Sequence, residues 1–426
     1  MNEARPLTGA MRSDRRALTI DEYEGVGGYQ AARKALKEMS PKEVTAVVKD
    51  SGLMGRGGAG FLTGLKWSLV PMDDVSPGPK YLICNGDEME PGAFKDRYLM
   101  EGNPHQLIEG MICAAYAIQA GKAFIFLRAQ YFEAKERLEL AIRDAHKKGY
   151  LGERIFGSNF SLDLQLHVSG GRYICGEETA LISALEGQRP VPRSKPPFPG
   201  VSGLFGRPTV VNNVETLSNI SHIINHGADW FKGLSKTDQG GTKIFGVSGH
   251  VNRPGLWELP VGTTIREVLE VHAGGMVDGY KFRGLLPGGG STDFLVEQHL
   301  DTPMDYQNIQ KAGSRLGTAT MIILDDKTCP IGFIANLMKF FAQESCGFCT
   351  PCREGLPWLA RMLYSFDRGK ATERDIDILQ EQTGKIWIGK TYCAHAPGAI
   401  EPLASGLKYF HKDFMDHIEH KGCPWS

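Results

Sequence analysis

The spacing of apolar residues changes along the chain, and each spacing is typical of one kind of element. Apolar positions recur every three to four residues in some stretches, as on one face of a helix, and form short runs or alternate in others, as in strands. Helices are expected over Tyr29–Glu38, Pro41–Asp50, Asn103–Ala120, Phe132–His146 and Glu178–Glu186, and strands over Lys80–Cys84, Ala123–Leu127 and Leu162–Val168. Because strands and helices alternate here, we expect an α/β layer fold with parallel strands.

The pattern changes twice further along the chain. A proline-rich run at Arg189–Pro199 and an expected loop at Gly200–Asn213 interrupt the first region. Beyond them the pattern predicts a small ubiquitin-like α+β domain, and after that only helices, which form a four-helix bundle. The strands of the α+β domain are Lys243–Ser248, Gly255–Leu259, Phe282–Leu286 and Thr320–Leu324, with a helix at Thr264–Val271; the last helices are Phe333–Ser345, Glu354–Phe366, Glu373–Ile386 and Ala399–Ile418.

These changes predict the domain boundaries. We expect an N-terminal arm over residues 1–20, either loose or a contact for a partner, and an α/β domain over 21–238. The ubiquitin-like domain should span 239–329 and the helical bundle 330–426.

Composition and charge narrow the class of protein. Apolar residues make up 42% of the 426 residues and charged residues 23%, as in soluble globular proteins. The 48 Lys and Arg nearly cancel the 49 Asp and Glu, which gives no reason to expect nucleic acid as a partner. No stretch reaches the roughly 18 apolar residues of a membrane span, and no secretory signal opens the chain. We therefore expect a reducing, cytoplasmic setting, where cysteines bind metals more often than they form disulfides.

Cysteine spacing is the most specific chemical signal. Cys346, Cys349 and Cys352 are separated by two residues each, and Cys393 is the natural fourth thiol. Three closely spaced cysteines and a distant one are typical of a [4Fe-4S] cluster. Structural zinc, the alternative, usually uses paired cysteines or Cys/His hairpins. Cys329 and Cys423 stay unassigned, the 12 histidines show no metal-ligand spacing, and His395 is expected at the surface.

Four weaker motifs suggest a nucleotide-like ligand. Gly55–Gly60 is glycine-rich, so its backbone N–H groups can approach a phosphate, and Arg56 and Lys66 add positive charge. The polar runs 84–92, 173–179 and 211–216 could each contact a flavin, its ribityl chain or a ribose. Taken singly, each motif could instead be a mobile turn, a solvated acidic turn or a helix cap.

Together, in this order, these motifs resemble the NADH-binding flavoprotein subunit of respiratory complex I, over about residues 21–420. The resemblance implies a Rossmann-like domain for FMN and NADH, a ubiquitin-like domain of SLBB type, and a bundle carrying a [4Fe-4S] cluster. It places FMN on Gly55, Arg56, Gly57, Lys66, Asn85, Asp87, Gly176, Glu177, Asn212, Asn213 and Thr216, NADH on Phe61, Glu90, Glu178, Lys195 and Phe198, and the cluster on Cys346, Cys349, Cys352 and Cys393. Leu69 departs from the family, where an aromatic residue is common.

The resemblance also implies the reaction and its partners. FMN would take a hydride from NADH, so no catalytic side chain is expected, and electrons would pass singly to the cluster and onward toward quinone. The implied partners are a thioredoxin-like [2Fe-2S] subunit of type E and a larger iron–sulfur subunit of type G. The chain would be peripheral on the cytoplasmic side of the inner membrane. The alternative is a diaphorase subunit of an NAD-dependent hydrogenase or formate dehydrogenase.

Overall fold

The computed structural model describes residues 4–72 and 78–425, and contacts within it divide the chain into two units. Unit 1 consists of Met1–Met89, Phe94–Ile244 and Glu258–Gly262, and unit 2 of Glu90–Ala93, Phe245–Trp257 and Thr263–Ser426. The mixed α/β class predicted from the sequence is confirmed. Each unit is described on its own below.

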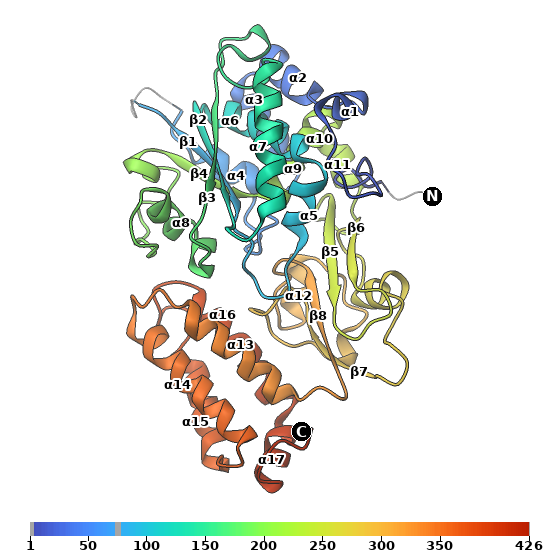
Figure 1. The fold of residues 1–426 in the computed structure, drawn as a ribbon, viewed down its shortest axis with the longest axis vertical. Helices are drawn as coiled ribbons and strands as arrows, with labels where there is room; N and C mark the ends of the chain where they lie inside the picture. Colours follow the sequence, from blue (N-terminus) through green and yellow to red (C-terminus); the bar gives the residue numbers. More distant parts are fainter. Residues whose placement is uncertain (1–3, 73–77, 426) are drawn as a thin grey trace. The chain divides into compact units, whose positions relative to one another are not determined.

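Unit 1 is built on a parallel sheet (Figure 1). The strands lie in the order β3-β2-β1-β4, and all neighbouring pairs are parallel. Strands β1, β2 and β4 are mainly buried, as expected for strands covered on both faces, whereas β3 at the edge of the sheet is largely exposed or half-buried. Strand bounds are β1 Tyr81–Gly86, β2 Lys122–Leu127, β3 Asp163–Val168 and β4 Thr209–Asn213. The prediction of a loop over Gly200–Asn213 is therefore wrong at its end, because β4 pairs with β1 there.

Helices cover this sheet. Helix α6 is buried on nearly every side, because it packs against β1, β2 and other helices at once, whereas α7 lies along β3 and buries one face. The helices of unit 1 are α1 Ile20–Gly25, α2 Gln30–Glu38, α3 Pro41–Asp50, α4 Thr63–Ser68, α5 Lys95–Gly102, α6 Pro104–Ile118, α7 Phe132–Lys147, α8 Glu178–Leu185, α9 Val214–Ser218, α10 Ile220–His226 and α11 Ala228–Gly233, with 3₁₀ turns η1 Ile155–Gly157, η2 Tyr173–Gly176 and η3 Leu204–Gly206. The predicted helices all form; the short α1, α4, α5, α9, α10 and α11 were not predicted.

Local sequence explains where the helices begin. Ser40 caps α3 by accepting a hydrogen bond from the Glu43 N–H, while Glu43 accepts from the Ser40 N–H in return. Pro41 then occupies the first helical position, where no N–H is required. This reciprocal pair of hydrogen bonds, a capping box, can be recognised in the sequence, and α3 begins at the predicted residue.

The N-terminal segment is packed rather than loose in its described part. Leu7 is buried, and the backbone N–H groups of Leu7 and Thr8 donate to the carboxylate of Glu258 at 3.0 and 2.8 Å. Thr242 also donates to Glu258 through its hydroxyl, at 2.6 Å. The Thr8 hydroxyl is a fourth donor at 2.9 Å, so this buried carboxylate fastens the segment within unit 1.

A second sheet has the strand order β6-β5-β8-β7, in which β5 and β8 are parallel and β7 and β8 antiparallel. The five elements predicted for this region are found, although the helix is a turn of π-helix. The bounds are β5 Thr242–Ser248, β6 Gly255–Pro260, η4 Glu267–His272, β7 Phe282–Leu286, η5 Glu297–His299, α12 Tyr306–Lys311 and β8 Thr320–Asp325.

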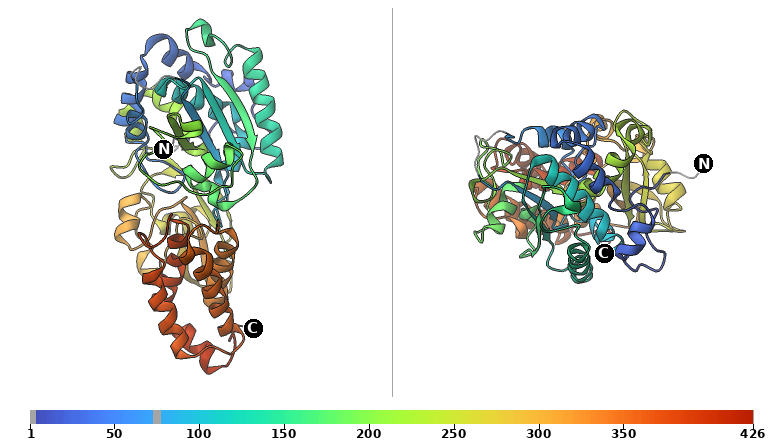
Figure 2. Two further views of the ribbon diagram at one scale, coloured as in Figure 1. Left: turned by 90° about the vertical axis from the view of Figure 1, so that its left-hand side faces the viewer. Right: turned by 90° about the horizontal axis from the view of Figure 1, so that it is seen from above.

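The rest of unit 2 is helical, and its helices pack side by side (Figure 2). Apolar faces of α13, α14 and α16 form the core. The bounds are α13 Pro330–Glu344, α14 Thr350–Asp367, α15 Glu373–Lys385, α16 His395–Tyr409 and α17 His411–Glu419. The prediction of a single last helix over Ala399–Ile418 is wrong. The backbone leaves helical geometry at Phe410, whose ring is buried against Phe294.

No helix among residues 4–72 and 78–425 combines the length and apolar character needed to cross a bilayer.

The close approach of α6 and α9 makes Gly110 a test of the packing. A Cβ built on Gly110 would lie 2.0 Å from the Leu217 carbonyl oxygen, a clash with backbone. Gly110→Ala should lower the free energy of unfolding by about 1–3 kcal/mol despite the higher helix propensity of alanine. Gly233→Ala in α11 is the matched control, because nothing lies within 4 Å of its Cβ among the described residues. Urea unfolding measures both; equal midpoints for the two variants would contradict the packing described.

Candidate functional site

The carboxyl ends of β1 and β4 bring together the first group of predicted residues. In the register, Asn85 lies beside Asn213 and Cys84 beside Asn212. From β1 the chain continues to β2 on one side, while β4 lies on the other, so the order of strands reverses at this point. Ligands of parallel α/β sheets bind outside the strand ends at such a reversal. Two separate polar motifs of the sequence thus meet at one edge.

The glycine-rich loop packs against the same edge. An isolated bridge between Met54 and Leu62 closes the loop, and the Arg56 N–H donates to the Thr216 hydroxyl at 2.8 Å. A Cβ on Gly57 would lie 3.0 Å from the Cβ of Asn213. The glycine there permits the loop backbone to lie directly on the turn between β4 and α9.

A network of buried charges underlies this loop. The carboxylate of Glu215 accepts from the ammonium groups of Lys95 and Lys243 at 2.8 and 3.3 Å, and from the Ile244 N–H at 2.9 Å. Lys95 also pairs with Asp96 at 2.6 Å, and Lys243 donates to the Arg56 carbonyl at 3.4 Å. The charged groups of Lys95, Lys243 and Glu215 are at most 1% exposed. Such a network is stable only when every charge has a partner.

The pKa values follow from these contacts. Burial by itself raises the pKa of Glu215, but the charges of Lys243, Lys95 and Arg56 lower it to about 2. Burial lowers the pKa of Lys243 to about 7, with Glu215 opposing and Lys95 and Arg56 adding to the shift. Glu215 is therefore ionised throughout the physiological range, as it must be to hold two ammonium groups.

The side chain of Arg56 is buried and contacts the backbone near the start of β5. The guanidinium donates to the carbonyls of Gly240 and Thr242 at 3.0 and 3.1 Å and is 1% exposed. Its Nε is buried and has no hydrogen-bond partner among the described residues. The positive charge predicted from the sequence is thus present beside the glycine loop. The terminal nitrogen Nη2 of Arg56, however, already donates to two backbone carbonyl groups.

Residues of the network also hold Asn213. Its side-chain amide donates to Asp96 at 2.6 Å, while its carbonyl oxygen accepts from the Glu215 N–H at 3.0 Å and caps α9. At the next strand position, Asn212 accepts from the Trp67 indole at 2.9 Å. Asp87 accepts from the Ser169 hydroxyl at 3.1 Å, and Asn85 from the Asp87 N–H at 3.1 Å. All these polar side chains have fixed orientations.

A second charged group lies at the start of α8. Glu178 accepts from Lys66 at 2.6 Å and from Lys195 at 2.8 Å, and the preceding Glu177 caps the helix by accepting from two backbone N–H groups. Burial raises the pKa of Glu178, but the two lysines outweigh it and the net shift is downward. Beside them, the backbone of Gly176 ends η2, and a Cβ there would meet nothing within 4 Å in the described chain.

Two predicted aromatic contacts are exposed. Phe61 and Phe198 are 51% and 60% exposed, which suits residues that stack on a ligand, and Leu69 is 60% exposed in the same unit. Glu90 belongs to unit 2, where its carboxylate accepts from the Ser291 N–H at 2.7 Å.

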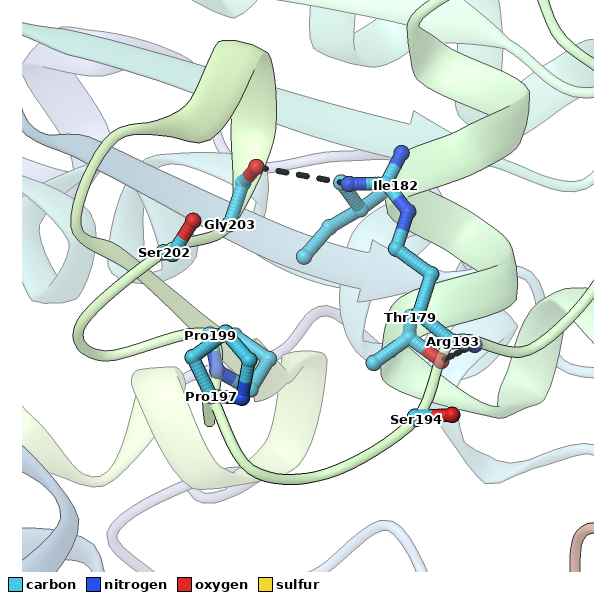
Figure 3. A pocket seen from close by; sticks show the side chains of 8 residues that line it. All are labelled: Thr179, Ile182, Arg193, Ser194, Pro197, Pro199, Ser202 and Gly203. Carbon is cyan, nitrogen blue, oxygen red and sulfur yellow. Dashed lines mark hydrogen bonds between the residues drawn. The ribbon is translucent and has the colours of Figure 1, made fainter.

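A small pocket lies between α8 and the loop that follows it (Figure 3). Arg193 spans it, because its N–H donates to the Thr179 hydroxyl at 2.8 Å and its guanidinium to the Gly203 carbonyl at 3.4 Å. The volume of about 170 Å³ is below the range of about 300–1,000 Å³ of ligand pockets. We interpret it as a packing gap beside Lys195, not as the site itself.

The cysteines predicted to hold a cluster lie at two helix starts. Cys346 and Cys349 precede α14, Cys352 is in its first turn, and Cys393 precedes α16. Burial raises the pKa of Cys352 to about 12, with the Ser345 hydroxyl, 3.1 Å from its sulfur, opposing the shift and the other three cysteines adding to it. Four thiols converging in this way fit a cubane cluster. The expectation of a surface His395 is wrong: it is buried, and its Nε2 lies 2.8 Å from the Phe341 carbonyl.

Sequence reasoning missed the buried members of the site. Lys95, Asp96, Glu215 and Lys243 come from α5, α9 and β5 and touch only in the fold. A lysine inside an apolar strand, as at Lys243, was the available signal, since unpaired buried lysines are rare.

Three protein-family models match parts of the chain. The family described as "Nuo51 FMN-binding domain" matches residues 48–222, "SLBB domain" matches 244–294, and "NADH-ubiquinone oxidoreductase-F iron-sulfur binding region" matches 332–417.

The chain is also similar to curated proteins along nearly its whole length. The F subunit of NADH-quinone oxidoreductase from Salmonella typhimurium is 54% identical over 98% of this chain and 94% of that protein. The Escherichia coli protein of the same name gives the same values, and that of Streptomyces coelicolor is 45% identical over 99% and 93%. Among solved structures, the air-oxidised NAD⁺-reducing [NiFe]-hydrogenase matches with a TM-score of 0.82 and 33% identity, over 96% of this chain and 67% of that one.

Glu215 gives a direct test of the buried network. Glu215→Gln leaves Lys243 buried beside a neutral side chain and leaves Lys95 with Asp96 alone, and breaking a buried pair in this way costs about 3–5 kcal/mol of unfolding free energy. Glu133→Gln is the matched control, because the Glu133 side chain is 59% exposed where it pairs with Arg137 in α7, and its loss should change stability by at most about 1 kcal/mol. Urea unfolding at pH 7 measures both. A Glu215→Gln protein as stable as the control would show that the network does not hold the site.

Proposed function

The chain belongs to the family of the NADH-quinone oxidoreductase F subunit, and from that premise we propose which residues bind each group. When bound, FMN accepts a hydride from NADH and releases its electrons one at a time to the [4Fe-4S] cluster. The observation that carries this proposal is the meeting of the glycine loop, Asn85 and Asn213 at the reversal point of a parallel sheet, in a chain that also has the cysteine triplet.

The proposed FMN residues centre on the edge of unit 1 where the glycine loop meets Asn85 and Asn213. Gly55 and Gly57 supply backbone that can approach a phosphate, and the charge of Arg56 and the buried network favours an anion there. Asn85 and Asn213, held by their neighbours, offer hydrogen bonds to the ring and ribityl chain at little further cost in entropy. The full proposed set is Gly55, Arg56, Gly57, Lys66, Asn85, Asp87, Gly176, Glu177, Asn212, Asn213 and Thr216.

The NADH residues orient the donor. Exposed Phe61 and Phe198 provide faces on which an adenine can stack. Lys66 and Lys195 keep Glu178 ionised, so it can accept hydrogen bonds from ribose hydroxyls and repel a 2′-phosphate. Leu69 replaces one aromatic face with an aliphatic surface, which weakens stacking without changing the chemistry. Glu90 completes the proposed set.

The cluster residues lie beside an exposed apolar surface. Phe348 and Tyr392 are 54% and 40% exposed, their rings are 4.7 Å apart, and nearby Ile388 is 70% exposed. Apolar exposure beside a redox centre suits docking of a protein that takes the electrons. We propose that the larger iron–sulfur protein of type G docks here and that the thioredoxin-like [2Fe-2S] protein of type E is the second partner. The assembly would place this chain peripherally, on the cytoplasmic side of the inner membrane.

One rival keeps a specific observation in its favour. The structural match to the NAD⁺-reducing [NiFe]-hydrogenase fits a diaphorase subunit of a hydrogenase or a formate dehydrogenase. The quinone oxidoreductase F subunits, however, are more similar in sequence than the hydrogenase chain is, and this chain covers more of their length. Nickel or molybdenum in the purified native complex would favour the rival.

A visible spectrum of the anaerobically purified protein tests the proposal. We expect flavin bands over a broad iron–sulfur absorbance, with the flavin bands bleaching on addition of NADH. Cys349→Ser should lose the broad absorbance and its iron yet keep flavin that NADH bleaches, because its FMN residues belong to the other unit. A colourless wild-type protein containing zinc, or a brown one without flavin, would contradict the proposal.

A further inference from the structure

Four side chains that could bind a metal meet at a second place in unit 2. The ligand atoms of Cys329, Asp367, His417 and Cys423 all lie within 4.8 Å of one another. They come from the residue before α13, the end of α14, α17 and the segment after α17. The function proposed above uses none of them, and their distant positions in the sequence gave no spacing to recognise.

The distances suit one tetrahedral ion. The Cys329 sulfur lies 3.4 Å from Nε2 of His417, and that nitrogen lies 3.7 Å from Oδ1 of Asp367. Zinc bonds of about 2.0–2.3 Å place neighbouring ligands of a tetrahedron about 3.3–3.8 Å apart. These two separations already match that spacing, and every other pair of ligand atoms lies within 4.8 Å.

The imidazole is already oriented for ligation. Nδ1 of His417 lies 2.7 Å from the Asp413 carbonyl oxygen. A carbonyl can only accept, so Nδ1 carries the hydrogen and the lone pair of Nε2 faces Cys329. The ring is fully buried and stacks on Trp425 at 5.7 Å between centroids. A backbone bond of this kind to the second nitrogen is the usual support of a metal-bound histidine.

Cys329 is placed to ligate as a thiolate. Its sulfur accepts from the Gly332 N–H at 3.2 Å and caps α13. Burial raises the pKa of the Cys329 thiol to about 12 and the Gly332 N–H opposes that shift, so the thiol loses its proton when a metal ion binds. Two thiolates, one imidazole and one carboxylate form a soft donor set that suits Zn²⁺ and does not suit Ca²⁺ or Mg²⁺.

We propose that Cys329, Asp367, His417 and Cys423 bind one structural Zn²⁺ that joins the segment after α17 to the starts and ends of the neighbouring helices. On binding, the two thiols release their protons to solvent, and all four coordination positions come from protein. The site is distinct from the cluster, because Cys352 and Asp367 lie at opposite ends of α14, about 22 Å apart at 1.5 Å per residue.

Zinc content of the full chain, prepared with its partner subunits, tests the proposal. Cys423→Ser and His417→Gln should each lose about one zinc per chain relative to wild type, with iron and FMN content unchanged. His420→Gln is the matched control: His420 is exposed and makes the same bond through Nδ1, to the Asp416 carbonyl at 2.8 Å. It should keep its zinc.

Two measurements on the wild-type protein cover the case in which a variant fails to fold. A mercurial reagent that titrates thiols should release one zinc, and Co²⁺ in its place should give thiolate-to-cobalt absorption. Equal zinc in wild type and Cys423→Ser would overturn the proposal. Wild-type protein without zinc would also overturn the proposal, whether alkylation and mass spectrometry then show a Cys329–Cys423 disulfide or two free thiols. Because iron and FMN are measured separately, failure here is distinguishable from failure of the redox function.

Discussion

One buried carboxylate organises the edge of the sheet on which the proposed function depends. Glu215 joins Lys95 of α5, Lys243 of β5 and the backbone that follows it, and Lys243 in turn reaches the carbonyl of Arg56 in the glycine loop. Elements far apart in the sequence are thus joined beneath a loop that has few side chains of its own. The rigidity that the proposed phosphate-binding loop needs is supplied by charges that are buried beneath it.

Most of the elements could be predicted from apolar spacing, because long periodic segments such as α3, α7 and α13 bury one face, and α3 and α13 also begin at a capping side chain. The end of β4 could not, since Asn212 and Asn213 read as loop residues although pairing with β1 makes them strand. The missed short helices have too few turns to show a period. The break at Phe410 was also hidden, because only burial of its ring against a distant segment interrupts the helix.

The candidate site also has a part that the sequence predicts and a part that only the fold reveals. The glycine loop and the cysteine triplet are contiguous motifs, so residue order alone predicts an anion loop and a cluster. The buried lysines, and the meeting of Cys329 with Cys423, depend on which segments the fold brings together, and no spacing in the sequence encodes that. Arg56 shows the mixed case: its charge was predicted, but its bonds to the Gly240 and Thr242 carbonyls were not.

The central claim is that the glycine loop, supported by the buried network, receives the phosphate of FMN. The most direct test compares the affinities of FMN and riboflavin for the deflavinated protein, since the two ligands differ only in that phosphate. Two charge-assisted hydrogen bonds at about 1.5 kcal/mol each predict that FMN binds roughly 100-fold more tightly. Equal affinities would show that the ring and ribityl chain alone are recognised, and would contradict the account.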